Sequence, residues 1–176
     1  YLTCSNGTVN IGGSATTATF EDEDSDSLSV SIIGTDGSSF ASTAGGSIYL
    51  TSNADYEIKS SYSAVVVLSD GTTTASKSFV LNVLNVNDNS PVFTSDTTFS
   101  AAENQTSIGT VVASDADGET LSYSISGTDA SSMSINSSTG ALIFNSAPDY
   151  ETKTSYTATV TATDGTNSKN QNITVN

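Results

Sequence analysis

The segment Leu28-Ser29-Val30-Ser31-Ile32 decides the fold class, because apolar residues and serines alternate strictly along it. Successive side chains of a β-strand point to opposite faces of the sheet, so this period of two predicts a strand with one buried face. The segment reappears as Leu121-Ser122-Tyr123-Ser124-Ile125, at an offset of 121 − 28 = 93 residues. The same kind of strand is therefore expected twice, at corresponding places in two copies of one module.

Three further matches follow in the same order along both copies. Their offsets are 93 residues for the first match (127 − 34) and 94 for the other two (149 − 55 and 163 − 69), so a single residue of slippage relates the copies. Matches in a fixed order indicate duplication of a module of domain size, which is too long for a solenoid repeat. The matched pairs are Gly34-Thr35-Asp36 with Gly127-Thr128-Asp129, Asp55-Tyr56-Glu57 with Asp149-Tyr150-Glu151, and Ser69-Asp70-Gly71-Thr72 with Thr163-Asp164-Gly165-Thr166.

Other segments carry the same alternation, and no apolar run has helical spacing with caps. Strands are predicted at residues 79–83, 133–135, 141–144 and 156–162, with a turn at Ser138-Thr139-Gly140. About seven short strands per copy predict an all-β fold of two tandem seven-stranded β-sandwiches of the immunoglobulin-like type.

The boundary between the copies is expected at Asn85-Val86-Asn87-Asp88-Asn89-Ser90-Pro91. Pro91 cannot donate to a strand ladder and stiffens the chain where a new strand begins. The segment is short and lacks the glycine and serine content of a free tether. The predicted domains are residues 1–88, truncated at the N-terminal edge, and residues 89–176, as part of a longer array.

The charge balance is extreme, with 19 acidic residues, four basic residues and a formal net charge of −15. Such a chain repels nucleic acid and anionic lipid, so neither is an expected partner, and no membrane-inserting segment is present. The acidic residues are clustered at strand ends and turns, where they predict a cation site. Six to eight oxygen ligands in loose geometry suit calcium better than magnesium, and the absence of histidine disfavours zinc and iron.

The clusters resemble the motifs of tandem cadherin repeats. The linker residues 85–91 are similar to DxNDNxP, Ala102-Glu103-Asn104 to the PEN element, and Asp115-Ala116-Asp117-Gly118 to DxDxG. Asp149-Tyr150-Glu151 resembles the family's DxE element, and Thr163-Asp164-Gly165 resembles AxDxG. The resemblance covers the whole chain and implies Greek-key sandwiches of the cadherin type with calcium at the joint between them.

Carried over residue by residue, the resemblance implies one calcium site with ligands from both copies. Asp88 would bridge ions, because it lies between the two groups of ligands. The glutamate of the PEN element falls on Asn10 in the first copy, so two or three ions are expected. The implied ligands are Asp55 and Glu57, the backbone carbonyl of Val86, the side chains of Asn87, Asp88, Asn89, Asp115, Asp117 and Asp164, and a backbone carbonyl near Asp129.

Three classes of function are open to such a chain. The first is an extracellular, cell-surface adhesion module stiffened by calcium, with another adhesin copy, a cell-surface protein or a polysaccharide as partner. The serine and threonine richness resembles the repeats of large secreted bacterial adhesins. The second is a carbohydrate-binding accessory module of a secreted polysaccharide-degrading protein, although tryptophan is absent and most tyrosines are predicted to face inward. The third, an enzyme, is disfavoured because the paired acids recur at joints and no histidine is present.

Overall fold

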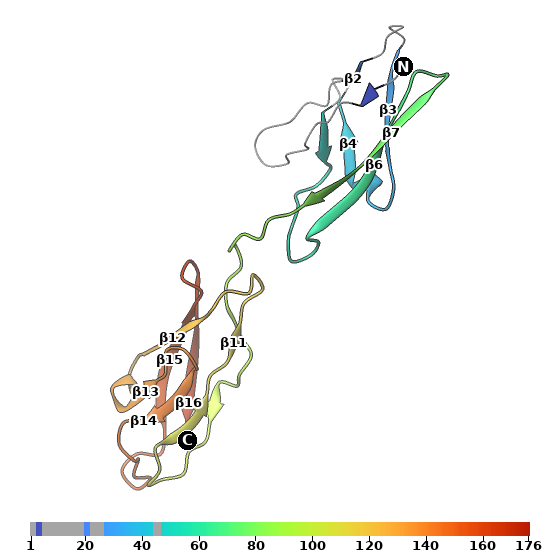
Figure 1. Ribbon diagram of the computed structural model, residues 1–176. Helices are drawn as coiled ribbons and strands as arrows, with labels where there is room; N and C mark the ends of the chain where they lie inside the picture. Colours follow the sequence, from blue (N-terminus) through green and yellow to red (C-terminus); the bar gives the residue numbers. More distant parts are fainter. Residues whose placement is uncertain (1–2, 5–19, 22–26, 44–46) are drawn as a thin grey trace. The chain divides into compact units, whose positions relative to one another are not determined.

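The computed structural model describes residues 3–4, 20–21, 27–43 and 47–176. The chain forms two compact units, divided between Asn85 and Val86, and each is described by itself (Figure 1). The division lies three residues before the predicted boundary at residue 88 (88 − 85 = 3). The linker amides of Asp88 and Asn89 donate hydrogen bonds to Asp117, which places the linker with the second unit.

The second unit contains two main sheets that enclose one apolar core. The first sheet has the strand order β12-β15-β16-β9, with β9 parallel to β16, and the second has the order β10-β14-β13; β8 pairs with β11. The bounds are β8 Val92–Phe93, β9 Thr98–Phe99, β10 Ser107–Thr110, β11 Ala113–Ser114, β12 Ser122–Ser126, β13 Met133–Ile135, β14 Ala141–Phe144, β15 Tyr156–Thr163 and β16 Ser168–Val175.

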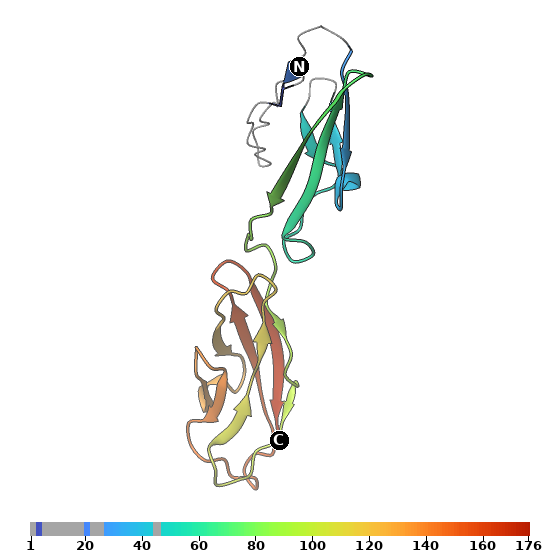
Figure 2. The ribbon, with the colours of Figure 1, turned by 45° about the vertical axis from the view of Figure 1, so that its right-hand side comes forward.

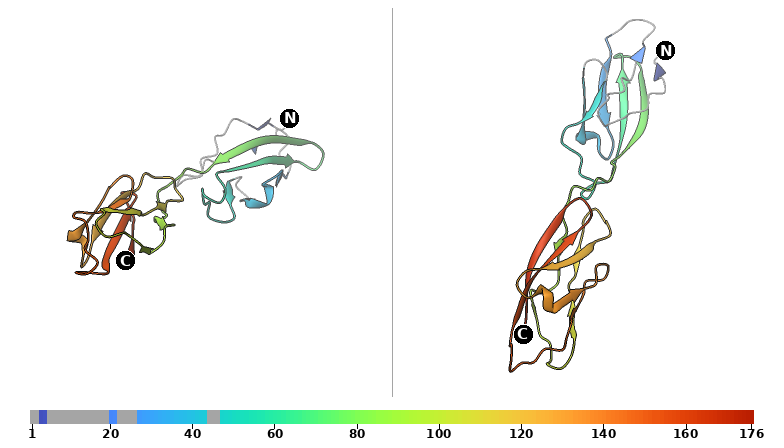
Figure 3. Two further views of the ribbon diagram at one scale, coloured as in Figure 1. Left: turned by 90° about the horizontal axis from the view of Figure 1, so that it is seen from below. Right: turned by 90° about the vertical axis from the view of Figure 1, so that its left-hand side faces the viewer.

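The hairpin of β15 and β16 sets the length of the second unit, as the red strands of Figure 3 show. Along β15 the side chains of Ala158, Val160 and Ala162 are buried, and the intervening threonines lie on the other face. This is the period of two that the sequence predicted. The core also contains Val111, Met133, Leu142, Phe144 and Ile173, each at most 2% exposed.

The first unit has three sheets among its described residues, with strand orders β3-β6-β7, β4-β5 and β1-β2. The hairpin of β6 and β7 is its longest element (Figure 2, green). Phe40 is buried between Tyr62 and Phe79, with ring centroids 6.1 and 5.0 Å away in edge-to-face geometry. The bounds are β1 Thr3–Cys4, β2 Phe20–Glu21, β3 Ser29–Ile33, β4 Phe40–Ser42, β5 Ile48–Leu50, β6 Ser61–Ser69 and β7 Thr74–Asn82.

The all-β prediction is confirmed. In the described part of the chain the helical segments are two short 3₁₀ turns, η1 (Gly37–Ser39) and η2 (Ala130–Ser132). No helix among these residues is long and apolar enough to cross a membrane. Strand β12 and its counterpart β3 expose their serines and turn Tyr123, Ile125, Val30 and Ile32 inward, as the alternation required.

An ion pair recurs at the same place in both units. Asp129 precedes η2, pairs with Lys153 and accepts a hydrogen bond from the amide of Thr157 (2.8 Å). The Lys153 ammonium also lies 4.8 Å from the centroid of the Tyr156 ring. Asp36, Lys59, Ser63 and Tyr62 repeat this arrangement in the first unit, with the ammonium 4.9 Å from the ring centroid. In the second unit the ion pair anchors the acidic turn before β15, and in the first unit its counterpart anchors the acidic turn before β6.

At neutral pH, the substitution Asp129→Asn should lower the unfolding temperature of the second unit. In acid, the variant and the wild type should unfold at nearly the same temperature. The hydrogen bond from Lys153 holds the pKa of Asp129 below its ordinary value of 3.8, and the amide of Thr157 lowers the pKa further. A lowered folded-state pKa gives stability that is present above 3.8 and is lost as the pH falls through the folded-state value. Calorimetry across this range tests the prediction, with Asp36→Asn as the matched control for the first unit. An equal decrease in the unfolding temperature of Asp129→Asn at neutral pH and in strong acid would contradict the prediction.

Candidate metal centre

The linker is held by one buried carboxylate of the second unit. Asp117 is 8% exposed, and its Oδ2 atom accepts hydrogen bonds from the backbone amides of Asp88 (3.1 Å) and Asn89 (2.8 Å). Its Oδ1 atom accepts a third from Asn89 Nδ2 (2.8 Å). Hydrogen bonds to an ionised acceptor are stronger than neutral ones, so Asp117 fixes the course of the backbone at residues 88–89.

The loop that carries Asp117 follows strand β11 and turns back at Gly118. The amide of Asp117 donates to Asp115 Oδ1 (2.9 Å), which holds the two carboxylates on the same loop close together. Gly118 has φ +85°, and a Cβ there would meet no atom within 4 Å. Glycine is therefore needed for the left-handed backbone conformation and not for lack of space.

Asp164 reaches the same end of the unit from the turn after β15. Its Oδ1 atom accepts hydrogen bonds from the amides of Thr166 and Asn167, both at 2.6 Å. Burial opposes the ionisation of Asp164, but these amide hydrogen bonds outweigh burial and lower its pKa. Asn167 also donates from Nδ2 to Asn87 Oδ1 (3.1 Å) and to the carbonyl of Asn89 (2.7 Å), so this turn is joined to the linker.

Glu119 is a fourth acidic residue at this end of the unit, and it lies outside the set of predicted ligands. One carboxylate oxygen from each of Asp115, Asp117 and Glu119 lies within 4.8 Å of the other two. Burial raises the pKa of the Glu119 carboxyl, and the negative charges of Asp117, Asp115 and Asp164 raise it further. The continued spacing of two residues from Asp115 through Asp117 to Glu119 could have identified it.

Three carboxylate oxygens in this group are buried without a hydrogen-bond donor among the described residues: Asp115 Oδ2, Glu119 Oε2 and Asp164 Oδ2. In Asp115 and Asp164 the other oxygen is fixed by backbone amides. Buried acceptors are normally satisfied, and a buried anion without a counter-charge is costly. Oxygen ligands held in this way suit a hard cation such as calcium.

Six of the predicted ligands are thus brought together within the second unit by hydrogen bonds among themselves and with Asn167. Val86 begins this unit, and Asp55 and Glu57 are exposed residues of the first unit. Asn10, which stands where the second copy has Glu103, lies outside the described residues. We call the six residues the linker cluster: Asn87, Asp88, Asn89, Asp115, Asp117 and Asp164.

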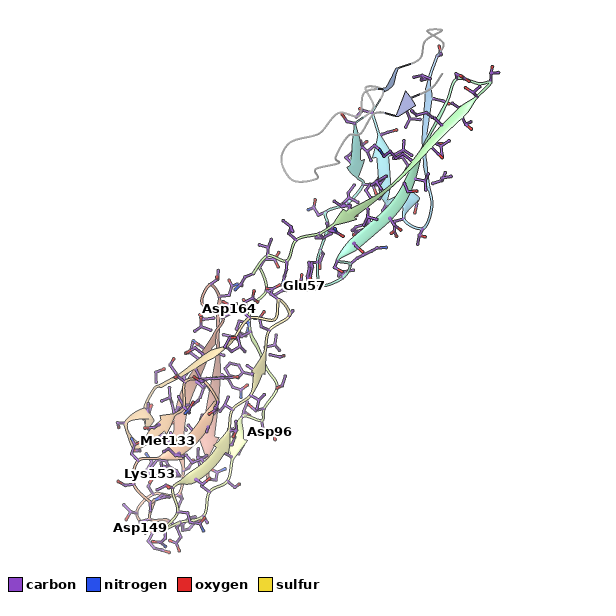
Figure 4. All side chains as sticks on the ribbon, in the orientation of Figure 1. Glu57, Asp96, Met133, Asp149, Lys153 and Asp164 are labelled. Atoms are coloured by element: carbon purple, nitrogen blue, oxygen red, sulfur yellow. The ribbon has the colours of Figure 1, made fainter. Side chains whose placement is uncertain are left out.

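The expectation that a backbone carbonyl near Asp129 joins the same site is wrong. Asp115 and Asp117 precede strand β12, whereas Asp129 follows it and bonds to Thr157 at the start of β15. Asp164 lies just after the other end of β15. It is seven residues beyond Thr157, which corresponds to about 23 Å at the rise of an extended strand. Figure 4 shows this separation, with Asp164 at one end of the unit and Lys153, the partner of Asp129, towards the other.

The acidic Asp-Tyr-Glu segments are turns, although the spacing of two residues between their acids would also fit an extended strand. Residues 56–58 and 150–152 form turns, closed by hydrogen bonds from the amide of Lys59 to the carbonyl of Asp55 and from Lys153 to Asp149. The aspartate caps its own turn, because Asp55 Oδ1 accepts from the amide of Ile58 (3.0 Å). The tyrosines are consequently exposed, by 39% and 58%, and do not enter the core.

Comparison with known proteins agrees with this architecture. The family model of the cadherin domain matches residues 97–176. Protocadherin Fat 1 of Homo sapiens is 37% identical over 130 residues, which are 68% of this chain and 3% of the relative. Cadherin-3 of Caenorhabditis elegans is 39% identical over 75 residues, which are 42% of this chain and 2% of the relative. The chain therefore spans only a few per cent of the curated relatives that it matches. These relatives are animal proteins, so the likeness to bacterial adhesins stays a prediction.

Solved cadherin structures match both repeats of this chain. Protocadherin gammaB7 EC3-6, solved as a cis-dimer, matches with a TM-score of 0.79 and 25% identity, over 99% of this chain and 48% of that one. Mouse cadherin-23 EC22-24 matches with a TM-score of 0.77 and 26% identity, over 95% of this chain and 59% of that one. The chain is a pair of tandem cadherin-like repeats and belongs to the cadherin-domain family of extracellular adhesion proteins.

Proposed function

We propose that the linker cluster binds calcium, and that calcium binding fixes the two repeats relative to each other in an extracellular adhesion protein. The observation that carries this proposal is the pair of buried carboxylate oxygens, Asp115 Oδ2 and Asp164 Oδ2, that accept no hydrogen bond from a described residue. Amides orient both carboxylates from the opposite side, so the ligands are held in place before any ion arrives.

Each member of the linker cluster has a distinct part in the proposal. Asp117 would fix the linker backbone while it offers charge to the site, and Asp115 and Asp164 would each bind through their second oxygen. Asp88 would bridge ions, with Asn87, Asn89 and the Val86 carbonyl as neutral oxygen ligands. Calcium supplies two positive charges and accepts six to eight oxygens in loose geometry.

The first repeat takes part through Asp55 and Glu57, and this step rests on the sequence resemblance. Their segment corresponds to a family element that contributes ligands to the following joint. With ligands on both repeats, the site would resist rotation about the linker, whereas without calcium the carboxylates would repel one another. Stiff repeats can present an adhesive surface at a distance from the cell. Another copy of the chain, a cell-surface protein or a polysaccharide is the proposed partner.

Small-angle scattering of this two-repeat chain tests the stiffening directly. Millimolar calcium should narrow the distribution of molecular shapes and lengthen the mean particle, with half of the change at roughly 0.1–1 mM, as for other extracellular calcium modules. Equal magnesium is the matched control and should have a much smaller effect, because magnesium demands strict octahedral geometry. Identical scattering in EDTA and in calcium would contradict the proposal, and pull-down on insoluble polysaccharides would then test the carbohydrate-binding alternative.

A further inference from the structure

The sheet β3-β6-β7 of the first repeat carries aliphatic side chains on its outer face, the face turned away from the core. We propose that this face binds the same face of a second copy of the chain. The inference rests on the proposed function, because it selects one of the partners named there and assigns it a surface. We call the residues that carry it the aliphatic patch: Ile33, Val65, Val67 and Val80.

Strand β6 has the sequence of a strand that is covered on both faces. Its residues 64–68 read Ala-Val-Val-Val-Leu, whereas the matching part of β15 reads Ala-Thr-Val-Thr-Ala. The first, third and fifth residues of the run are buried in the core, so Val65 and Val67 point to the outer face. Continuous aliphatic runs are typical of strands that are buried on both faces. Beside this strand, however, Ile33 and Val80 are 53% and 63% exposed.

The strand pairing joins these side chains into one patch. Ile33 lies directly opposite Val65 on β3, and Val80 of β7 is diagonal to Val65, which pairs with Ser78. Side chains directly opposite each other have Cβ atoms about 4.5–5.5 Å apart, and diagonal neighbours about 7–8 Å. Val67 follows on the same face of β6, two residues from Val65. Single exposed valines are ordinary on a protein surface, but a contiguous group of them indicates an interaction surface.

The second repeat shows that the fold does not require these aliphatic side chains. Valine and threonine share a β-branched shape and a preference for strands, so strand formation does not explain the choice of valine in the first repeat. The apolar surface is what the two repeats do not share, and it is available only to a contact outside the repeat. At the four positions that the same strand pairing matches, the second repeat carries hydroxyl groups: Ser126, Thr159, Thr161 and Thr174.

Charge favours a second copy as the partner. The chain has a net charge of −15, so two copies repel each other, whereas a basic partner would be drawn to the acidic clusters. On the outer face of the three strands, the residues beside the aliphatic patch are serines, Thr74 and Asn82, and none is charged. Two copies can therefore meet at this face without placing like charges opposite each other. Such a contact is two-fold symmetric, with the two sheets about 10 Å apart.

The test compares the full two-repeat chain with the double variant Val65→Thr and Val67→Thr, which installs the residues of the second repeat. Dimerisation is measured by sedimentation equilibrium in EDTA, at about 0.1 M and about 1 M salt, where charges are screened beyond roughly 10 Å and 3 Å. The wild type should dimerise, and more tightly at high salt, because screening weakens the repulsion between copies. The double variant should dimerise at least about tenfold more weakly, because four buried methyl groups are replaced in each dimer.

The matched control is Val92→Thr with Val112→Thr, which makes the same change at two exposed valines of the second repeat and should leave dimerisation unchanged. A wild type that stays monomeric at both salt concentrations would overturn the proposal, as would equal dimerisation of the wild type and the double variant. Methyl NMR of the wild type needs no variant. The signals of Val65, Val67 and Val80 should shift as the protein concentration rises, and those of the control valines should not. The opposite pattern would also overturn the proposal.

Scattering in EDTA and in calcium, at a concentration low enough to keep the chain monomeric, separates this inference from the proposed function. If calcium stiffens the chain and dimerisation does not depend on the aliphatic patch, only the inference fails. If dimerisation depends on the patch and the shape of the monomer does not respond to calcium, only the proposed stiffening fails.

Discussion

Asp117→Ala should lower calcium affinity about 100-fold and release the linker backbone. The substitution removes a charged ligand and the acceptor for three donors, the amides of Asp88 and Asn89 and the side-chain amide of Asn89. Calcium affinity is read by titration calorimetry, and the linker is read by hydrogen exchange at the two backbone amides. Both amides should exchange faster even in EDTA, because their hydrogen bonds to Asp117 are independent of any ion.

Two variants sharpen this experiment. Asp117→Asn keeps an acceptor oxygen but loses the charge, so it should retain part of the amide protection while it loses most of the calcium affinity. Asp96→Ala removes an exposed acid of the same repeat and should change neither measurement (Figure 4). Unchanged calcium affinity in Asp117→Ala would contradict the linker cluster as the metal site. Unchanged exchange at residues 88 and 89 would show that Asp117 does not hold the linker.

The strands could be predicted from the sequence because their pattern is local. In β12 and β15, apolar and hydroxyl residues alternate without interruption, and burial follows the alternation. The Asp-Tyr-Glu segments show the limit of such a local pattern. A spacing of two residues also fits a turn, and here the turn is fixed by the aspartate side chain and an i to i+4 backbone hydrogen bond.

The proximity of the candidate ligands to one another was predicted only in part, because strand direction decides at which end of the unit a loop lies. Asp115 and Asp117 come before β12 and Asp129 comes after it, so the strand itself separates them. Counting strand crossings could have removed Asp129 from the ligands. Glu119 and Asn167 each lie just past a recognised motif. The spacing of two residues could have indicated Glu119, whereas only the packing shows that Asn167 contacts the linker cluster.

Gly140→Ala should destabilise the second repeat more than any other single-methyl change at its glycines. Gly140 has φ +70°, and a Cβ there would lie 2.1 Å from the carbonyl oxygen of Val111 and 3.6 Å from the Tyr123 ring. The amide of Val111 donates to the Gly140 carbonyl (2.9 Å), so neither segment can move without breaking the other's hydrogen bond. Left-handed backbone costs about 1–2 kcal/mol and overpacking about 1–3 kcal/mol, which together lower the unfolding temperature by roughly 10 °C or more.

Gly165→Ala is the matched control, because Gly165 has φ +98° and a Cβ there would meet no atom within 4 Å. The difference between the two variants, measured by calorimetry in EDTA, isolates the steric clash from the backbone strain. Equal effects would mean that the turn at Gly140 relaxes freely. If Gly140→Ala destabilises the second repeat more than Gly165→Ala does, it should also weaken calcium binding near the unfolding temperature of the variant. The reason is that Val111 lies only four residues before Asp115 and is joined to it through β11. The packing of this turn then determines how firmly the loop that carries Asp115 is held.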